Sequence, residues 1–368
     1  MESILYIGMD VHTTNYTLCS YMFEGDKTFG LIQVAPDYLE VVKYVNKMKR
    51  NIGNDIRVIC GYEAGCLGYS LYRDLTRCGI ECIILAPSTI AVAPNERKND
   101  YRDAAKLARC LAYNTYKPVY VPDVEDDSVK EYIRMRDNLR EHIKTLKQQI
   151  LALCTRWKKT YSDGKNWTQR HMDWLRKLKV ENKFLQETFD EYVAQLDEAL
   201  TKLKRYDQRI EEMAELPRYA EKVAKLTCFC GIKKHTALAT IVEISDFDRF
   251  ATANRFVAYL GLAPGEHSSA DSGPHLGITK QGNRHIRTLL VESAQCYARA
   301  IPGRTSSELV KRQQGNSPKV IAYANKGSER LKRRYRAMIA NKPKPVAVTA
   351  VARELACFIW GMMTEHYA

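Results

Sequence analysis

Two acidic residues, Asp100 and Asp103, stand three positions apart at the start of an Ala- and Leu-rich run, and this spacing suits metal chemistry. On a helix, residues three apart share one face, one turn from each other. Two carboxylates held that close repel, and a divalent cation relieves the repulsion most readily. The helix dipole alone also favours acids in a first turn. The pair therefore gains meaning only if further carboxylates lie beside it.

Two further acids stand near the ends of predicted strands. Residues 4–11 are an apolar run that closes around Asp10, and residues 57–64 are another that closes around Glu63. Local patterns predict the remaining elements of this region, with strands over 16–22, 31–34 and 82–86 and helices over 36–49 and 69–78. The predicted element order is β-β-β-α-β-α-β-α. This is the order of a ribonuclease H-like domain, in which an antiparallel meander is followed by crossover helices.

In such a domain the first and fourth strands end side by side, and the last helix packs against them. Four acids would then converge, namely Asp10, Glu63, Asp100 and Asp103. Four carboxylates in one pocket cannot all stay ionised without cations, so we expect two divalent ions, Mg²⁺ or Mn²⁺, about 4 Å apart. Such ions activate an attacking oxygen and stabilise the leaving oxygen of a phosphodiester. The alternative for each acid alone is a solvated strand end.

A second candidate for chemistry lies in residues 261–287. Small and hydroxyl-bearing residues, including Ser268 and Ser269, are followed at once by the basic residues Lys280, Arg284 and Arg287. A serine beside groups that bind phosphate is suited to nucleophilic attack. The alternative is a Ser- and Gly-rich loop before a solvated basic helix.

Two weaker signals precede that segment. Cys228 and Cys230 lack a second Cys/His pair at zinc spacing, so we do not expect a metal there. A Gly231–Ile232 turn between predicted helices resembles a helix-hairpin-helix, which offers backbone N–H groups to a phosphate. Lys233 stands where that motif usually has its second glycine.

The charge of the chain is unevenly distributed. The 368 residues carry a net charge of +14, yet residues 1–110 hold 13 Lys/Arg and 13 Asp/Glu and are neutral. The whole excess belongs to the remainder, which indicates surfaces that bind a polyanion. No apolar run approaches the length of a membrane span, and the N-terminus lacks the features of a signal peptide. We therefore expect a cytoplasmic protein that binds nucleic acid and no membrane.

The middle and the end of the chain are predicted to be helical. Residues 128–161 and 167–216 carry apolar residues at near-heptad spacing, which predicts either an antiparallel hairpin or a coiled-coil contact between subunits. The fold class is thus α/β followed by all-α. We expect three parts, an α/β domain over 1–115, a helical coiled-coil or oligomerisation segment over 116–217, and a mostly helical C-terminal domain over 218–368.

A basic cluster with an interleaved Tyr335 lies near the C-terminus. Its members are Arg330, Lys332, Arg333, Arg334 and Arg336. Such a cluster fits contact with a phosphate backbone, and it is also what a solvated helix face looks like.

Together, four motifs make the chain resemble the DEDD transposases of the insertion-sequence 110 family. They are Met9-Asp10-Val11-His12, Tyr62-Glu63-Ala64-Gly65, Lys98-x-Asp100-x-x-Asp103-Ala104, and the Gly-Leu-x-Pro…Ser-Ser…Thr-Lys-x-Gly-Asn block within 261–287. The resemblance implies a RuvC-like nuclease domain, a coiled-coil linker and a C-terminal transposase domain with a nucleophilic serine. The four acids would be the Mg²⁺ ligands.

The same resemblance places the nucleophile at Ser269, five residues after Pro264, with Ser268 as the alternative. Ala270 stands where the family usually has a glycine after that serine. The resemblance further implies a structured guide RNA that pairs with element and target DNA. It also implies dimers joined into tetramers, in which the RuvC-like domain and the serine of different subunits complete each site, in a nucleoid-associated bacterial protein.

Our hypothesis from the sequence is a recombinase whose serine attacks a DNA phosphodiester with the assistance of metal ions. A RuvC-like endonuclease or resolvase would use metal-activated water and need no serine. An actin- or hexokinase-type phosphotransferase is suggested by residues 7–10 followed by Thr13 and Thr14, but a second Gly-rich phosphate loop is lacking. A non-catalytic scaffold that binds RNA or DNA is the remaining alternative.

Overall fold

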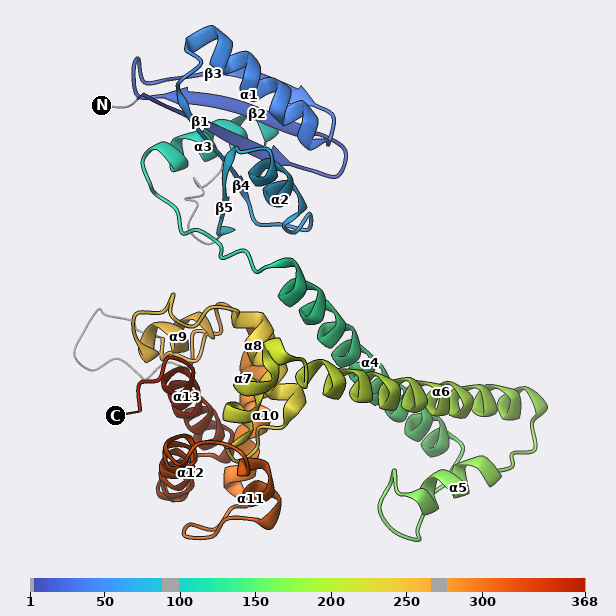
Figure 1. Cartoon of the computed structure of the whole chain (residues 1–368). Coiled ribbons are helices and arrows are strands. Elements are labelled where there is room, and N and C mark those ends of the chain that lie inside the picture. The colour runs from blue at the N-terminus through green and yellow to red at the C-terminus, as the bar shows by residue number, and fades with distance from the viewer. Residues whose placement is uncertain (1–2, 88–98, 266–276, 368) are drawn as a thin grey trace. The chain divides into compact units, whose positions relative to one another are not determined.

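The chain forms two compact units, Met1–Val121 and Pro122–Ala368, which are described separately. The computed structural model describes residues 3–87, 99–265 and 277–367 (Figure 1). The first unit is mixed α/β and the second is helical apart from one isolated β-bridge among its described residues. The predicted class, α/β followed by all-α, is confirmed at this level. The three-part division of the chain stays a prediction.

The first unit is built on a five-stranded sheet in the order β3-β2-β1-β4-β5. Its elements are β1 (Ile4–Val11), β2 (Tyr16–Met22), β3 (Lys27–Val34), α1 (Tyr38–Ile52), β4 (Arg57–Glu63), α2 (Ser70–Arg77), β5 (Glu81–Leu85) and α3 (Asp100–Ala112). β1, β2 and β3 pair antiparallel, whereas β4 runs parallel to both β1 and β5. The central strand β1 therefore ends beside β4.

Apolar residues alternate along β1 and β4, so each strand supplies two packed faces. On one face Leu5, Ile7 and Met9 pack with residues of α1 and α2. On the other face α3 lies against the sheet (Figure 1), and its Leu107 and Leu111 are buried there.

Two glycines let α3 lie very close to the sheet. A Cβ on Gly8 would lie 2.1 Å from the Ala104 carbonyl oxygen and 2.2 Å from the Ala108 nitrogen, and a Cβ on Gly61 would lie 2.8 Å from a Leu111 methyl carbon. Backbone atoms cannot yield to such contacts, so Gly8 is required by packing. The close approach brings the first turn of α3 next to the end of β1.

In the second unit, two long helices form a hairpin. α4 (Val124–Arg156) and α6 (Lys183–Ala214) lie side by side, and α5 (Gln169–Lys177) belongs to the segment that joins them (Figure 1). Their apolar stripes bury each other, with Ile150 and Leu196 fully buried in the shared cluster. Of the two arrangements left open by the sequence, the hairpin within one chain is the one observed.

The single helix expected over 167–216 is wrong in one respect, because the chain leaves helical geometry between α5 and α6. Asn182 explains the restart, since its side chain accepts a hydrogen bond from the Leu185 N–H as the N-cap of α6. Gln186 accepts from the Val180 N–H and donates to the Leu178 carbonyl, which satisfies the backbone of the break.

The rest of the second unit is a helical core. It comprises α7 (Pro217–Thr227), α8 (Lys234–Ile244), α9 (Ala253–Tyr259), α10 (Arg284–Ala294), the 3-10 turn η2 (Gln295–Ala298), α11 (Ser307–Gln313), α12 (Pro318–Ile339) and α13 (Lys344–Met363). Contrary to the expectation of no such run, α13 is long and apolar enough to be a candidate membrane span. It packs against α9, α10 and α12 with Val351, Leu355 and Ile359 fully buried, as a core helix does.

The turn between α7 and α8 is closely packed against the rest of the unit. Gly231 has φ of +83°, and a Cβ there would lie 2.3 Å from the Ser293 carbonyl oxygen. Its neighbours Phe229 and Ile232 are buried in the core of the unit. The glycine is therefore needed for close contact with α10, and the resemblance to a helix-hairpin-helix stays a prediction.

Candidate active site

Asp10 lies near the end of β1 on the face that α3 covers. It follows Gly8 by two residues, and side chains two apart in a strand point to the same face. β1 and β4 pair with Gly8 opposite Gly61 and Met9 opposite Tyr62. Continuing that register by one residue places Asp10 beside Glu63, on the same face of the sheet.

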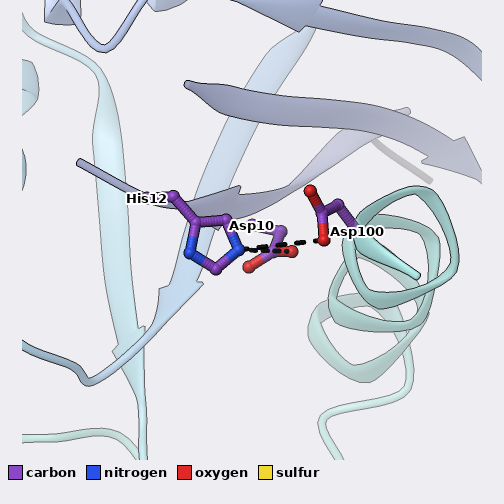
Figure 2. Close-up of side chains that lie close together, drawn as sticks. All are labelled: Asp10, His12 and Asp100. Carbon is purple, nitrogen blue, oxygen red and sulfur yellow. Dashed lines mark ion pairs between the residues drawn. The ribbon is translucent and has the colours of Figure 1, made fainter. Parts of the chain in front are cut away.

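Asp10, His12 and Asp100 come together at this point (Figure 2). His12 Nε2 lies 3.3 Å from Asp10 Oδ2 and 3.9 Å from Asp100 Oδ1. Each residue offers one ligand atom, and these three atoms lie within 4.8 Å of one another. Asp100 is held in place by Asn99, whose side chain accepts a hydrogen bond from the Tyr101 N–H as the N-cap of α3.

The electrostatics of Asp10 favour a cation. Its Oδ2 is buried and makes no hydrogen bond within the residues that the structure describes. Burial raises the pKa of Asp10, and the charges of Asp100 and Asp103 raise it further while His12 opposes the shift. A buried carboxylate oxygen without a hydrogen bond, close to a second carboxylate and an imidazole, is a donor set that fits a divalent cation.

The structure treats the other two predicted acids differently. Asp103 lies close enough for its charge to act on Asp10, one turn after Asp100 on α3. Glu63 ends β4 and is exposed, and its side chain is not part of the group of close ligand atoms. Strand register brings its backbone next to the site, so the role of Glu63 as a ligand stays a prediction.

His12 is the one member of this group to which the sequence gave no role. The available signal was its position two residues after Asp10, which puts both side chains on one face when the strand continues. The strand ends at Val11, but the His12 N–H donates to the Asn15 carbonyl in the following turn, and the imidazole still lies beside Asp10.

Ser268 and Ser269 fall outside the described residues, but the two segments that flank 266–276 are described. Pro264 and Ile278 form a β-bridge, and the Gly265 N–H donates to the Gly277 carbonyl at 2.8 Å. The Thr279 N–H donates to the Ala263 carbonyl at 2.9 Å. Residues 261–265 and 277–281, called the two stems below, are thus paired with each other.

The predicted nucleic-acid-binding residues divide by exposure. Lys280, Arg284 and Arg336 are exposed, whereas Arg287 is half-buried and donates to the Leu260 carbonyl. Lys332 is buried, so its predicted contact with nucleic acid has no support from its exposure. Its side chain is 6% exposed and its ammonium donates to the Arg304 carbonyl.

The other members of the C-terminal cluster are paired with acids. Arg330 and Arg334 both contact Glu354, and Arg333 contacts Glu329. All three arginines are exposed, so a polyanion can reach them by displacing these carboxylates or by binding the arginines together with them.

Comparison with known proteins identifies the family to which this chain, with its α/β unit and its helical unit, belongs. A DEDD transposase family model matches residues 7–157, and a model described as the transposase IS116/IS110/IS902 family matches residues 223–309. The fold and the site therefore belong to a transposase, an enzyme class that moves DNA by recombination.

Similar proteins carry the same description over most of their length. The putative transposase y4qE of Sinorhizobium fredii is 35% identical over 83% of this chain and 75% of its own length. The transposase for insertion sequence element IS1533 of Leptospira borgpetersenii is 31% identical over 94% of this chain and 99% of its own. The transposase for IS1111A of Coxiella burnetii is 23% identical over 89% and 88%. The chain belongs to the IS110 family of DEDD transposases.

Proposed function

We propose that this transposase is a metal-dependent, RNA-guided DNA recombinase with a serine nucleophile and an RNase H-like, RuvC-like first domain. The observation that carries the metal-dependent part is the buried Asp10 Oδ2, which lies close to Asp100 and His12 without a hydrogen bond. The strand order, with the parallel β4 beside β1 and α3 laid across both, supports the assignment of the fold.

Asp10 and Asp100 would hold the cation, with Asp103, Glu63 and His12 around it. When bound, a divalent cation supplies Lewis-acid stabilisation of phosphodiester oxygens. The chain's own contribution is to hold two carboxylates at fixed positions on a strand and a helix. Gly8 sets their separation, because it determines how closely α3 approaches β1.

The serine step that we propose exchanges one ester for another. Ser269 Oγ, or Ser268 Oγ, attacks a DNA phosphorus and forms an O–P bond, while the bond from phosphorus to the leaving sugar oxygen breaks. The serine proton passes to a base and the leaving oxygen takes up a proton. The phosphoserine link keeps the ester energy for rejoining. Support for this step comes from the family motif in 261–287 and from the exposed Lys280 and Arg284 that follow it.

We also propose a guide RNA, dimers and tetramers. The family resemblance supports all three, and the basic charge of the chain after residue 110 supports binding of a nucleic acid. A metal-dependent RuvC-like endonuclease is the second candidate, because the acidic group is assembled wholly within the first unit and needs no serine. Membership in a transposase family leaves the phosphotransferase reading without support.

Trapping a covalent adduct separates these two candidates. The full chain is combined with Mg²⁺ and with the RNA transcribed from the noncoding DNA of the element. The DNA substrate is nicked so that its leaving strand is lost after cleavage, and the products are analysed on a denaturing gel. We expect a protein–DNA adduct that Ser269→Ala abolishes, while Ser268→Ala and the nearby control Ser272→Ala retain it. An adduct lost only in Ser268→Ala would move the nucleophile by one residue. Strand exchange by both variants, or cleavage without an adduct, would refute the serine mechanism.

A further inference from the structure

A buried polar network inside the second unit joins α4, α8 and α10. At its centre His285 has Nδ1 3.0 Å from Glu243 Oε1 and Nε2 2.7 Å from Asp137 Oδ2. Carboxylates with these short contacts accept hydrogen bonds, so both ring nitrogens must donate. With both carboxylates ionised, this geometry makes His285 a doubly protonated, positively charged imidazolium.

Glu243 is the most enclosed member of the network, with a side chain only 3% exposed. Arg134 donates to it from Nε at 2.8 Å and from Nη2 at 3.0 Å, and Asn283 Nδ2 donates at 2.8 Å. Burial alone would raise the pKa of Glu243, but the hydrogen bonds from His285 and Arg134 outweigh it and lower the pKa to about 2. Glu243 is thus a fixed anion on α8.

Asp137 supplies the second anion, on α4. Arg136 contacts it at 2.8 Å and also contacts Asp207 of α6 at 2.6 Å, and His235 Nε2 of α8 lies 3.0 Å away. The cations Arg134, Arg136 and His285 then balance the anions Glu243, Asp137 and Asp207. Without the proton on His285, the carboxylates of Asp137 and Glu243 would lose the positive charge that lies between them.

The network opens onto a cavity of about 900 Å³ whose lining includes further charged groups. Arg140 of α4 pairs with Glu292 of α10 at 3.0 Å, and Lys144 pairs with Glu141 at 3.2 Å. Arg284, exposed in the first turn of α10, lines the same cavity. These groups lie at the rim, and none of them replaces the contacts of His285 with its two carboxylates.

A short chain of contacts runs from His285 to the two stems. Asn283, which donates to Glu243, also caps α10 by accepting from the Ile286 N–H, and its own N–H donates to the Tyr259 carbonyl. A Cβ on Gly282 would lie 2.0 Å from that carbonyl oxygen, so residues 282 and 259 are in tight contact. The Lys280 N–H donates to the Gly261 carbonyl at 3.1 Å. The stems therefore end on the helix turn that the network holds.

We propose that protonated His285, bridging Asp137 and Glu243, is a positioning residue that fixes the two stems to α4 and α8, and that strand exchange depends on it. The effect on strand exchange rests on the proposed function, in which the residues between the stems carry the nucleophile. The structural part of the inference is that His285 holds the two stems to α4 and α8, and it involves described residues alone.

The stabilisation of the folded state by His285 depends on pH, and the pKa of His285 fixes the direction of that dependence. Burial would lower the pKa of His285, but hydrogen bonds to Asp137 and Glu243 outweigh it and raise the pKa to about 9. A raised histidine pKa stabilises the folded state fully below the ordinary value of about 6.5, and the stabilisation is lost as pH rises through about 9. Glu243 acts in the acid range. Because its pKa is lowered, it stabilises the folded state at neutral pH, and this stabilisation is lost as pH falls toward about 2.

Hydrogen exchange of the stem amides tests the structural part in the full-length protein. The amides of Gly265, Thr279 and Lys280 are followed at pH 7 in the wild type, in His285→Gln and in a matched control, His142→Gln, which replaces an exposed histidine of α4. We expect these amides to exchange about tenfold faster in His285→Gln, while amides of α13 keep their protection. His142→Gln should match the wild type.

A second measurement guards against a variant that fails to fold. In the wild type, the protection of the stem amides, after correction for the intrinsic exchange rate, should fall between pH 7 and pH 10 while that of β1 stays unchanged. Unchanged protection of the stems in His285→Gln, or across this pH range, would overturn the inference.

A strand-exchange assay tests the functional part. His285→Gln should lower the rate at saturating DNA about 100-fold with little change in DNA affinity, because misplaced groups lose rate before binding. Loosened stems with a normal rate would refute the positioning role. Failure of the serine mechanism itself is read separately from Ser269→Ala and Ser268→Ala, and it would leave the exchange result on the stems intact.

Discussion

Asp10 shows how a single residue can be kept in an unfavourable state. Its Oδ2 is buried without a hydrogen bond within the described residues, and it lies near two like charges on α3. His12 lies 3.3 Å from this oxygen, but burial and the charges of Asp100 and Asp103 still raise the pKa of Asp10, so its ionised form costs free energy. Retaining such a group is understandable if a cation compensates it during function.

Substitution of this carboxylate by an amide of the same size separates its two effects. Asp10→Asn should remove the rise in melting temperature that Mn²⁺ causes, which for the wild type corresponds to about 3 kcal/mol at 100 times the Kd. Without metal, Asp10→Asn should be at least as stable as the wild type, because a partly buried negative charge beside Asp100 and Asp103 is gone. Thermal melts with and without Mn²⁺ measure both, with the exposed Asp55→Asn as the control. A full Mn²⁺ response in Asp10→Asn would contradict the assignment of Asp10 as a ligand.

For single residues, the sequence could predict which acids meet at the site, but it could not predict every neighbour of a side chain. Asp10, Asp100 and Asp103 could be placed together because each sits at a recognisable end of a strand or helix. His12 could not be given a role, since its position depends on how the chain turns after β1. The burial of Lys332 was not predicted, because a run of charges on a helix still has an inward stripe, and Leu331, Lys332 and Tyr335 all lie on it.

At the scale of elements, the packing of α3 on β1 determines whether the acidic group exists. The contact depends on Gly8, where a side chain would collide with the backbone of α3. The buried face of α3, including Ala104, Leu107 and Ala108, then fixes its rotation and so the direction of Asp100 and Asp103.

Gly8→Ala tests this dependence. We expect a loss of at least about 2 kcal/mol in the free energy of unfolding, because the added methyl group forces backbone apart. The variant should also lose its response to Mn²⁺, since α3 must move away from β1. Urea unfolding and melts with Mn²⁺ measure the two effects. Gly65→Ala is the matched control, because the nearest atom to a Cβ there is 3.9 Å away. A stable Gly8→Ala protein with normal Mn²⁺ binding would show that α3 does not set the site.

The element order of the first unit could be read from local patterns, because its strands and helices carry their own apolar periods and because Asp37 and Asn99 cap α1 and α3. The separation of α5 from α6 could not, since it depends on Asn182 and on contacts of Gln186 with the preceding backbone. The use of Gly231 was likewise decided by α10, which is remote in sequence.

At the scale of the whole molecule, the chain separates two kinds of chemistry. The acidic group lies in a unit whose sequence is close to neutral, and the positive charge lies in the remainder of the chain. Such a division suits an enzyme that must hold a polyanion with one part and cut it with another. An oligomeric state or a guide RNA could not be derived from residue patterns, because either would depend on partners and not on this chain's own core.

We propose that Asp10, His12 and Asp100 together form a divalent cation site. Anomalous diffraction from crystals of the full-length protein grown with Mn²⁺ can locate the ion. We expect a manganese peak within bonding distance of Asp10 Oδ2 and an Asp100 carboxylate oxygen, and its loss in Asp10→Asn. Well-ordered crystals that show both side chains but no manganese at saturating concentration would refute the cation site.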